Sequence, residues 1–412
     1  MSLRSTWCLL LLVLVGCGSL TPASRETSIH PAADAAESTA SVLADSIRAA
    51  YLWQRLRHLN PPVHFAYRTA APPSIDGDLD EAAWSDAPAL SPFTEITGQP
   101  TMPDSISTTV RIMWDDDALY IGARLREPHV WGTQTEKNSI IFHENDFEVF
   151  IDPDADFHRY HELEINALGT IWELTLMSPY RDGGPYTIPD NFPGLKKAVS
   201  VKGTINDPSD IDEGWSVEIA VPWEDLSNLH DLDPIPDDGA VLRMNFSRVR
   251  WDLVAQDSGY TKTTPPSEIN WTWSPTGIVD IHRPEKWGAV IFINSEPPPP
   301  REAPSQQAQA LQSSVQNELE LQKHLMDAYY FAAHYRARKN RFPLSLQEIH
   351  PDIRSADPEL CYAYSGSEEE YLMQIARRPY DQTCPKSPES WKKPEIRGFS
   401  IDHRGKLRRI DN

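Results

Sequence analysis

The sequence is poor in cysteine and in basic residues. Its 412 residues include 4 cysteines, and 60 acidic side chains outnumber 38 Lys and Arg, giving a formal net charge of −22. Phosphate backbones are bound by clustered Lys and Arg, so this charge argues against nucleic acid as a partner. The sequence contains no nucleophile motif, zinc triad or phosphate-binding loop, and no Cys-x-x-Cys-His for covalent haem attachment. No motif therefore indicates an enzyme.

The N-terminal apolar run is too short to span a membrane stably, but it has the pattern of a secretory signal. Arg4 precedes apolar residues 7–15, and small residues follow. Residues 14–17, Leu-Val-Gly-Cys, resemble the bacterial lipobox, whose cysteine receives lipid and becomes the new N-terminus. The resemblance implies an exported lipoprotein with a signal peptide at 1–16 and lipidation at Cys17.

The residue after Cys17 bears on where a lipoprotein would be sorted, and one alternative interpretation of the signal stays open. Gly18 follows the cysteine, which by resemblance to lipoprotein sorting favours the outer membrane in a cell that has one. A plain signal peptide with a chance cysteine would instead leave a freely soluble protein.

The remaining cysteines predict one disulfide. Cys8 would leave with the signal and Cys17 would carry lipid, so only Cys361 and Cys384 remain. In an oxidising envelope compartment they are expected to pair. The bridge would stabilise the fold by roughly 3 kcal/mol, because closing this loop lowers the entropy of the unfolded chain.

The composition divides the mature chain into four segments. Residues 17–71 are rich in Ala, Ser and charged residues and predict a stalk with a short helix. Residues 72–295 form the main domain, and 296–304, EPPPPREAP, predict a stiff proline-rich linker. Residues 305–412 predict a long helix followed by a small α+β unit.

The main domain consists of short runs that alternate apolar and polar residues, separated by turn signals. Many short strands without helical periodicity between them predict an antiparallel β-sandwich of jelly-roll or immunoglobulin-like type. The chain is therefore expected to be mainly β, with a small C-terminal α+β unit led by a long helix.

Six motifs in the main domain occur in an order typical of one family. They are IDGDLDEAAW at 75–84, VRIMWD at 110–115, ALYI at 118–121, NDFEVFID at 145–152, GWSVEIAVPW at 214–223 and RPEKWG at 283–288. This set resembles the family 9 carbohydrate-binding modules and their relatives. The resemblance implies non-catalytic binding of a polysaccharide or oligosaccharide, in support of polysaccharide capture and carbohydrate catabolism, with separate glycoside hydrolases as partners.

Alternation also predicts a polar sheet face. A period of two places carboxylates, amides and a guanidinium on one side of three strands, namely Glu148, Glu164, Asn166, Arg243 and Asn245. Planar polar groups chelate sugar hydroxyls, while aromatic rings cover the apolar faces of sugars. The same alternation would also arise in a sheet with one wet face and no ligand.

Asp78 and Glu81 predict a capping box whose helix docks Trp84 on the sandwich.

Tryptophans and family positions complete the candidate site. Trp172 and Trp215 are expected in the core, whereas Trp131, Trp271 and Trp273 lie in expected loops and are candidate ligand contacts. The best-known members of the family clamp a sugar between two tryptophans. The matching positions here hold no tryptophan and fall near Phe142 or His143 and near Ile281 or His282. The family's glutamine and arginine fall near Glu144 and Glu164.

The resemblance thus implies a set of ligand-binding residues without the tryptophan clamp. They are Phe142, His143, Glu144, Glu148, Glu164, Asn166, Asn245, Trp273 and His282. The specificity of the family for a sugar end is not expected to transfer.

Asp152, Asp154 and Asp156 offer three hard oxygen ligands at alternate positions. Members of the family often hold structural calcium, so the resemblance implies a calcium site here. The segment lacks the downstream glycine and glutamate of an EF-hand loop. A solvated acidic turn is the alternative.

Three rival functions remain open at the level of sequence. Glu148 and Glu164 are the carboxylate pair that a hydrolase of O-glycosyl bonds would use. Related DOMON-type sandwiches bind haem through Met, His or Lys, for which Met113, Met244 and His282 are available. A purely structural envelope protein is the third.

Overall fold

The computed structural model describes residues 59–410, except for 185, 188–191, 229, 231–234, 258, 298–302, 350–358, 378–383, 386–390 and 392–396. The expected signal, Cys17 and the stalk up to residue 58 lie outside the described residues. Among the helices that are described, none is long and apolar enough to cross a membrane.

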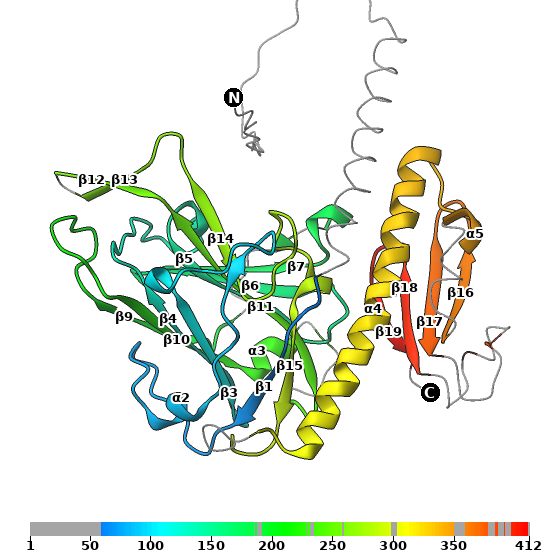
Figure 1. The fold of residues 1–412 in the computed structure, drawn as a ribbon, viewed down its shortest axis with the longest axis horizontal. Helices are drawn as coiled ribbons and strands as arrows, with labels where there is room; N and C mark the ends of the chain where they lie inside the picture. The colour runs from blue at the N-terminus through cyan, green and yellow to red at the C-terminus, as the bar shows by residue number, and fades with distance from the viewer. Residues whose placement is uncertain are drawn as a thin grey trace, which may run out of the picture.

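One large, curled sheet forms the main domain and folds its two halves toward each other (Figure 1). The first half, in spatial order, contains β8 (Tyr186–Thr187), β7 (Ile171–Leu176), β6 (Tyr160–Asn166), β5 (Asp146–Asp152), β11 (Val241–Trp251) and β15 (Gly288–Ile293). The second contains β3 (Thr108–Trp114), β4 (Ala118–Arg126), β10 (Gly214–Pro222) and β9 (Lys196–Lys202). The sandwich predicted from alternation is confirmed.

Strand β1 (Val63–Arg68) joins the two halves, because it pairs with both β15 and β3. Both pairings are parallel, unlike every other ladder between the described strands. Phe65, Ala66 and Tyr67 are buried. The sandwich therefore begins inside the segment that composition assigns to the stalk.

Smaller elements decorate the sheet. They are β2 (Thr94–Glu95) and β14 (Glu268–Thr272), which pair with each other, the hairpin of β12 (Leu253–Gln256) and β13 (Gly259–Lys262), and the helices α2 (Ala82–Asp86) and α3 (Trp223–Ser227). Short 3-10 turns are η1 (Asp104–Ile106), η2 (Ile141–His143), η3 (Tyr180–Asp182) and η4 (Pro284–Lys286).

The core between the two halves is built from alternate residues of facing strands. Ile112 of β3 and Ile121 of β4 lie opposite Phe147 and Val149 of β5, and all four are fully buried in one cluster. Each such side chain contributes about 1.5–3 kcal/mol by leaving water. Trp215 belongs to the same core, as expected.

Buried Glu218 of β10 ties two of the sequence motifs together. Its Oε2 accepts hydrogen bonds from the backbone N–H groups of Asp76 and Gly77, at 2.9 and 2.8 Å, and its Oε1 accepts from Trp84 Nε1 at 2.6 Å. Trp84 thus docks as predicted. The capping box does not form: α2 begins after Glu81, whose Oε1 accepts from the N–H of Ser74 instead of capping the helix.

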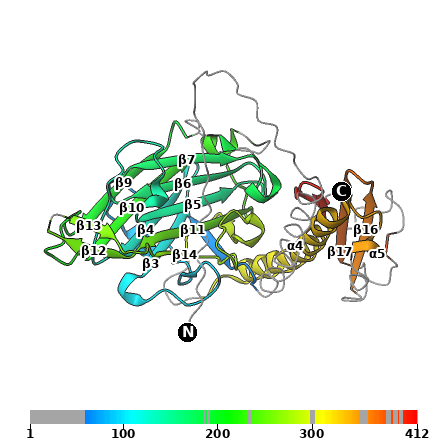
Figure 2. The same cartoon turned by 90° about the horizontal axis from the view of Figure 1, so that it is seen from above.

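The C-terminal unit pairs a long helix with a four-stranded antiparallel sheet, as predicted (Figure 2). Helix α4 (Gln306–Lys339) begins at Ser305, whose side chain accepts from the N–H of Ala308, and ends at Asn340 in the left-handed conformation. The other elements are α5 (Leu346–Ile349), β16 (Leu360–Gly366), β17 (Tyr371–Arg377), β18 (Gly398–Asp402) and β19 (Leu407–Ile410). The predicted disulfide joins Cys361 to Cys384.

Helix α4 contacts both units. Its first turns pack Ala308 and Val315 against β1 and β15 of the sandwich, and its later turns pack Leu325 and Tyr329 onto the C-terminal sheet (Figure 1). Phe157, from the loop after β5, lies in the core of the C-terminal unit. The two units therefore share buried surface.

We expect Glu218→Ala to lower the free energy of unfolding by at least about 2 kcal/mol, because it leaves three donors without their shared acceptor. Urea unfolding of the full chain measures this. Exposed Glu213, replaced in the same way, is the matched control and should change little. Equal, small effects of the two substitutions would contradict the role of Glu218.

Candidate functional site

The polar sheet face predicted from alternation exists, but it is covered rather than wet. Asp146, Glu148, Phe150 and Asp152 alternate along β5 and point away from the core that holds its other residues. Every residue of β5 is buried. Phe150 packs against Tyr160 and Trp287, which cover the middle of the face. Acidic groups lie on both sides of this aromatic centre.

The first acidic group, which we call the carboxylate cluster, consists of Asp146, Glu148, Glu162 and Glu164. Asp146, Glu148 and Glu164 each place one carboxylate oxygen within 4.8 Å of the others, and Glu162 hydrogen-bonds to Glu164. Their side chains are between 0 and 5% exposed. None of the four forms an ion pair with any residue that the structure describes.

Burial therefore acts on these carboxylates without a paired cation, since Arg248 acts on Asp146 only through space and is itself bound to Glu127. It raises the pKa of Glu148 to about 7. Burial first, and neighbouring carboxylates second, raise the pKa of Asp146, Glu162 and Glu164 well above the ordinary range. Hydrogen bonds satisfy some of the oxygens: Val249 N–H donates to Asp146 Oδ1, and Phe142 N–H donates to Glu164 Oε2, both at 3.0 Å. Asp146 Oδ2 is buried without a partner.

Partly exposed rings border the carboxylate cluster, and we call Phe142, Trp172, Tyr180 and His282 the aromatic surface. Phe142 stacks on Trp172, with ring centroids 5.8 Å apart and planes 22° apart. Trp172 packs on the aromatic centre of the face together with Ile281. Tyr180, 46% exposed, meets His282 edge to face at 4.5 Å. Rings and carboxylates thus lie side by side.

Trp172 is a candidate ligand contact that the sequence predicts to lie in the core. The register pairs Trp172 with Glu164, and Leu174, which is in phase with Trp172, packs with it in the cluster around Phe150, so all three project from the covered polar face. Counting alternate residues from Glu164 across the turn at 167–170 would have placed Trp172 on the same face of the sheet as Glu164.

Phe142 and Ile281, two of the positions that the resemblance places near the family's clamp, flank Trp172. Phe142 contacts it directly, and Ile281 joins the same apolar cluster. His143 is exposed beside Phe142, at 4.8 Å between ring centroids. His282 hydrogen-bonds through Nδ1 to the Tyr160 hydroxyl at 3.2 Å, and burial lowers its pKa to about 4. Phe142, Glu148 and Glu164 are therefore brought together, whereas His282 contacts Phe150, Tyr160 and Tyr180.

Other predicted site residues are used internally. Glu144 accepts from the N–H groups of Thr133 and Gln134, and from Asn166 Nδ2. The amide oxygen of Asn166 accepts from Leu168 and Thr170 in the turn after β6. Both side chains thus stabilise loops, and their polar atoms are already paired.

Predicted site residues on β11 and in the chain that follows it are also used in internal contacts. Asn245 Nδ2 donates to Ser274 O, and its Oδ1 accepts from Ser274 N–H, so it fixes the chain after Trp273. Trp273 itself is buried in the sandwich core and packs on Gly288, where any Cβ would clash with its ring. Trp131 and Trp271 are also buried. Arg243 donates to Trp287 O and Glu285 O, away from the carboxylate cluster.

The second acidic group is Asp152, Asp154 and Asp156, whose oxygens also lie within 4.8 Å of one another. Here the chain supplies its own cations: Arg159 pairs with Asp154 at 3.0 Å, and Lys406 pairs with Asp156. Asp152 Oδ1 and Asp154 Oδ1 are buried without partners. Calcium at these residues stays a prediction, and the two ion pairs disfavour it because they occupy oxygens that an ion would need.

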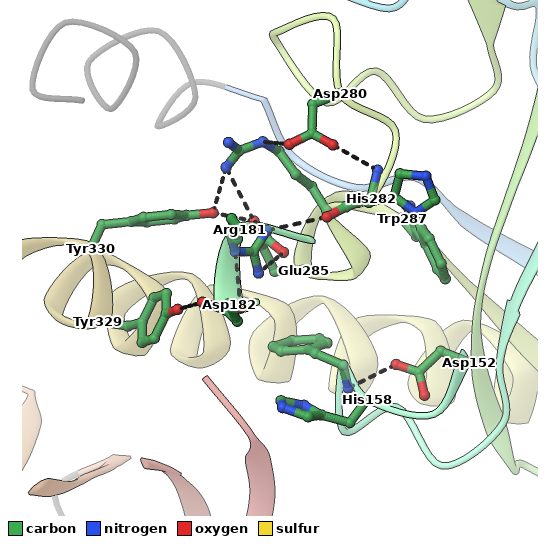
Figure 3. A network of polar contacts seen from close by, with 12 residues as sticks. Asp152, His158, Arg181, Asp182, Asp280, His282, Glu285, Trp287, Tyr329 and Tyr330 are labelled. Atoms are coloured by element: carbon green, nitrogen blue, oxygen red, sulfur yellow. Dashed lines mark hydrogen bonds and ion pairs between the residues drawn. The ribbon is translucent and has the colours of Figure 1, made fainter. Parts of the chain in front are cut away.

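A polar network connects the covered face to α4 (Figure 3). Arg181 of η3 binds Glu285 bidentately, at 3.1 and 3.0 Å, and donates to His282 O at 3.4 Å. Tyr330 of α4 donates to Glu285, and Tyr329 donates to Asp182. Burial alone would raise the pKa of Glu285, but Arg181 and Arg283 outweigh it and hold that pKa below its ordinary value. The loop that carries His282 is thus fixed between η3 and α4.

The geometry bears on the rival chemistries. Glu148 and Glu164 are cross-strand neighbours beneath the rings, whereas glycosidases place two carboxylates on either side of a bond to be cut. Met113 and Met244 lie in different buried clusters, and His282 lies in neither. Neither arrangement favours hydrolysis or haem ligation.

Comparison with known proteins identifies the domain that carries this face. Residues 75–294 match the family described as carbohydrate family 9 binding domain-like. The chain belongs to this family. It is also 26% identical over 215 residues, 52% of the chain, to the exoglucanase XynX of Acetivibrio thermocellus, but the match spans only 16% of that enzyme.

Solved structures resemble the family 9-like domain as well. A family 9 module from Caldicellulosiruptor kristjanssonii in complex with cellotriose is 14% identical, with a TM-score of 0.37, over 59% of this chain and 98% of the module. A second structure of a family 9 module from that organism, in complex with glucose, is 15% identical with a TM-score of 0.37, over 58% of this chain and 100% of the module.

Glu148 gives the family 9-like domain a measurable dependence on pH. Its pKa is about 7 when folded and 4.5 in the reference state, so between these values the folded chain holds a proton that the unfolded chain has lost. The free energy of unfolding therefore falls as pH rises through this interval. We expect wild type to lose roughly 2–3 kcal/mol relative to Glu148→Gln between about pH 5 and pH 8.

Urea unfolding of both proteins in metal-free buffer checks this prediction. Exposed Glu224, replaced by Gln, is the control and should follow wild type at both pH values. A wild-type and Glu148→Gln difference that is independent of pH would show that Glu148 titrates normally.

Proposed function

We propose that the chain is a non-catalytic carbohydrate-binding protein whose ligand rests on the aromatic surface. The observation that carries the proposal is the position of Phe142 and Trp172, stacked and partly exposed over Glu164, in a member of this family. A ring face packs against the apolar C–H face of a sugar, while carboxylates at its edge accept from hydroxyls. His282 and Tyr180 extend the surface along the strands.

Without the two clamp tryptophans, the aromatic surface suits several units of an oligosaccharide rather than a single terminal sugar. A clamp of two parallel rings closes around one terminal residue. The aromatic surface instead presents Phe142 and Trp172 at one place and Tyr180 with His282 at another. We infer that successive units of an oligosaccharide contact these two places.

We expect Trp172→Ala to weaken oligosaccharide binding about ten-fold or more, since one stacked ring contributes roughly 0.5–1.5 kcal/mol beyond the area it buries. Calorimetry on the full chain with glucose, cellotriose and a panel of plant and algal oligosaccharides measures this. Tyr335→Ala on α4, away from the sheet face, is the control. Silence across the panel would favour a purely structural envelope protein, and equal binding by the two variants would show that the ligand does not rest on Trp172.

The same panel tests catalysis. Because Glu148 and Glu164 do not flank an open groove, we expect no new reducing ends after long incubation. Release at the rate of a known hydrolase would replace the binding proposal with a hydrolase of O-glycosyl bonds.

We further propose that the protein is exported and held to the envelope by lipid on Cys17, in the outer membrane of a cell that has one. The support is the lipobox-like sequence at 14–17. Each buried CH₂ contributes about 0.8 kcal/mol, so several acyl chains bind a membrane durably. An anchored binder would hold polysaccharide near separate glycoside hydrolases and so assist carbohydrate catabolism.

Replacing Cys17 by Ser tests the anchor. We expect the substitution to abolish labelling by a fatty-acid analogue and to move the protein from the membrane to the soluble fraction. Cys8→Ser is the matched control and should leave both unchanged. An unlabelled wild type would favour the plain signal peptide.

A further inference from the structure

The carboxylate cluster differs from the other acidic group because none of its members forms an ion pair with a residue that the structure describes. At Asp152, Asp154 and Asp156, Arg159 and Lys406 neutralise two of three charges. At Asp146, Glu148, Glu162 and Glu164, the described part of the chain supplies no ion pair at all. Arg248 acts electrostatically on Asp146, but its guanidinium and that of Arg250 are both bound to Glu127.

Four buried carboxylates without counter-charges must hold protons or bind a cation, since a buried unpaired charge costs several kcal/mol. Two observations favour a cation. Asp146 is fully buried, and its Oδ2 has no hydrogen-bond partner although Oδ1 accepts from Val249. No lysine or arginine donor reaches Glu148 or Glu164 among the described residues.

The spacing of the oxygens suits calcium. Ca–O distances are about 2.3–2.6 Å, so oxygens on opposite sides of the ion lie about 4.6–5.2 Å apart. The oxygens of Asp146, Glu148 and Glu164 lie within 4.8 Å of one another. Calcium also prefers carboxylate oxygens and accepts irregular geometry.

We propose that Asp146, Glu148 and Glu164 bind a calcium ion, with Glu162 beside them as a further oxygen donor. The ion would lie under the aromatic surface, because Glu164 also accepts from the N–H of Phe142. Calcium therefore fixes η2 and the stacked Phe142–Trp172 pair from below. This link to sugar binding rests on the proposed function, whereas the ion site rests on the carboxylates alone.

Calcium binding to the full chain, after removal of metals with a chelator, tests the site. Calorimetry with calcium chloride should show one site, and the melting temperature should rise with calcium concentration, because a ligand of the folded state stabilises it. Glu148→Gln and Glu164→Gln should each weaken calcium binding ten-fold or more. Asp154→Asn, in the other acidic group, is the matched control and should retain the wild-type affinity.

The two glutamine variants should still fold, because removing an uncompensated buried charge should leave the metal-free chain at least as stable as wild type at neutral pH. A loss of calcium binding in these variants would therefore report on the site and not on unfolding. No calcium binding by wild type overturns the site. So does binding that survives both glutamine variants and is lost in Asp154→Asn. A larger shift with magnesium than with calcium overturns the choice of ion.

Glycan binding with and without calcium separates this inference from the proposed function. Calcium binding without any glycan binding would overturn the proposed function and leave the ion site standing. Glycan binding that is unchanged by chelator and by Glu148→Gln would support the proposed function and overturn the link between ion and ligand surface.

Discussion

The central constraint on this protein is that β5, β6 and β11 are buried on both faces. One face packs in the sandwich core, as Phe147, Val149 and Phe246 do. The other face lies beneath η2, the loop of His282 and α4, although its sequence is rich in carboxylates. If this face were exposed to water, its carboxylates would stay ionised without a large desolvation penalty. Here the cover turns them into a group of strongly perturbed acids.

The cover itself is held by ionic and aromatic contacts rather than by strand pairing. Arg181 and Glu285 fix η3 against η4, and Tyr330 brings α4 to the same glutamate (Figure 3). Trp287 then closes over Phe150. Because α4 also packs against the C-terminal sheet, the C-terminal unit contributes to the arrangement of the loop that carries His282. The aromatic surface and the second unit are thus physically connected.

The candidate site of the family 9-like domain combines buried charge with aromatic side chains. Glu164, which the resemblance places near the family's arginine, stands among three other carboxylates. Phe142 and Ile281, which the resemblance places near the family's two tryptophans, flank a different tryptophan, Trp172. The scaffold is retained because Glu218, Trp84 and the alternating core depend on backbone positions that do not involve the ligand face.

The sequence alone determined the sandwich, the long helix, the Cys361–Cys384 pair and the family, because periodicity, cysteine count and ordered motifs are local properties. It also placed Glu148 and Glu164 on one face, since side chains alternate along a strand. It missed β1 in the stalk and gave Trp172 to the core. Which residues are covered, which cations are near, and whether Asn166, Asn245 and Trp273 are free for a ligand depend on loops and on α4, which are distant in sequence. Only the tertiary structure decided these, because burial and charge pairing are set by what packs on top of a strand, and the strand's own sequence does not record its cover.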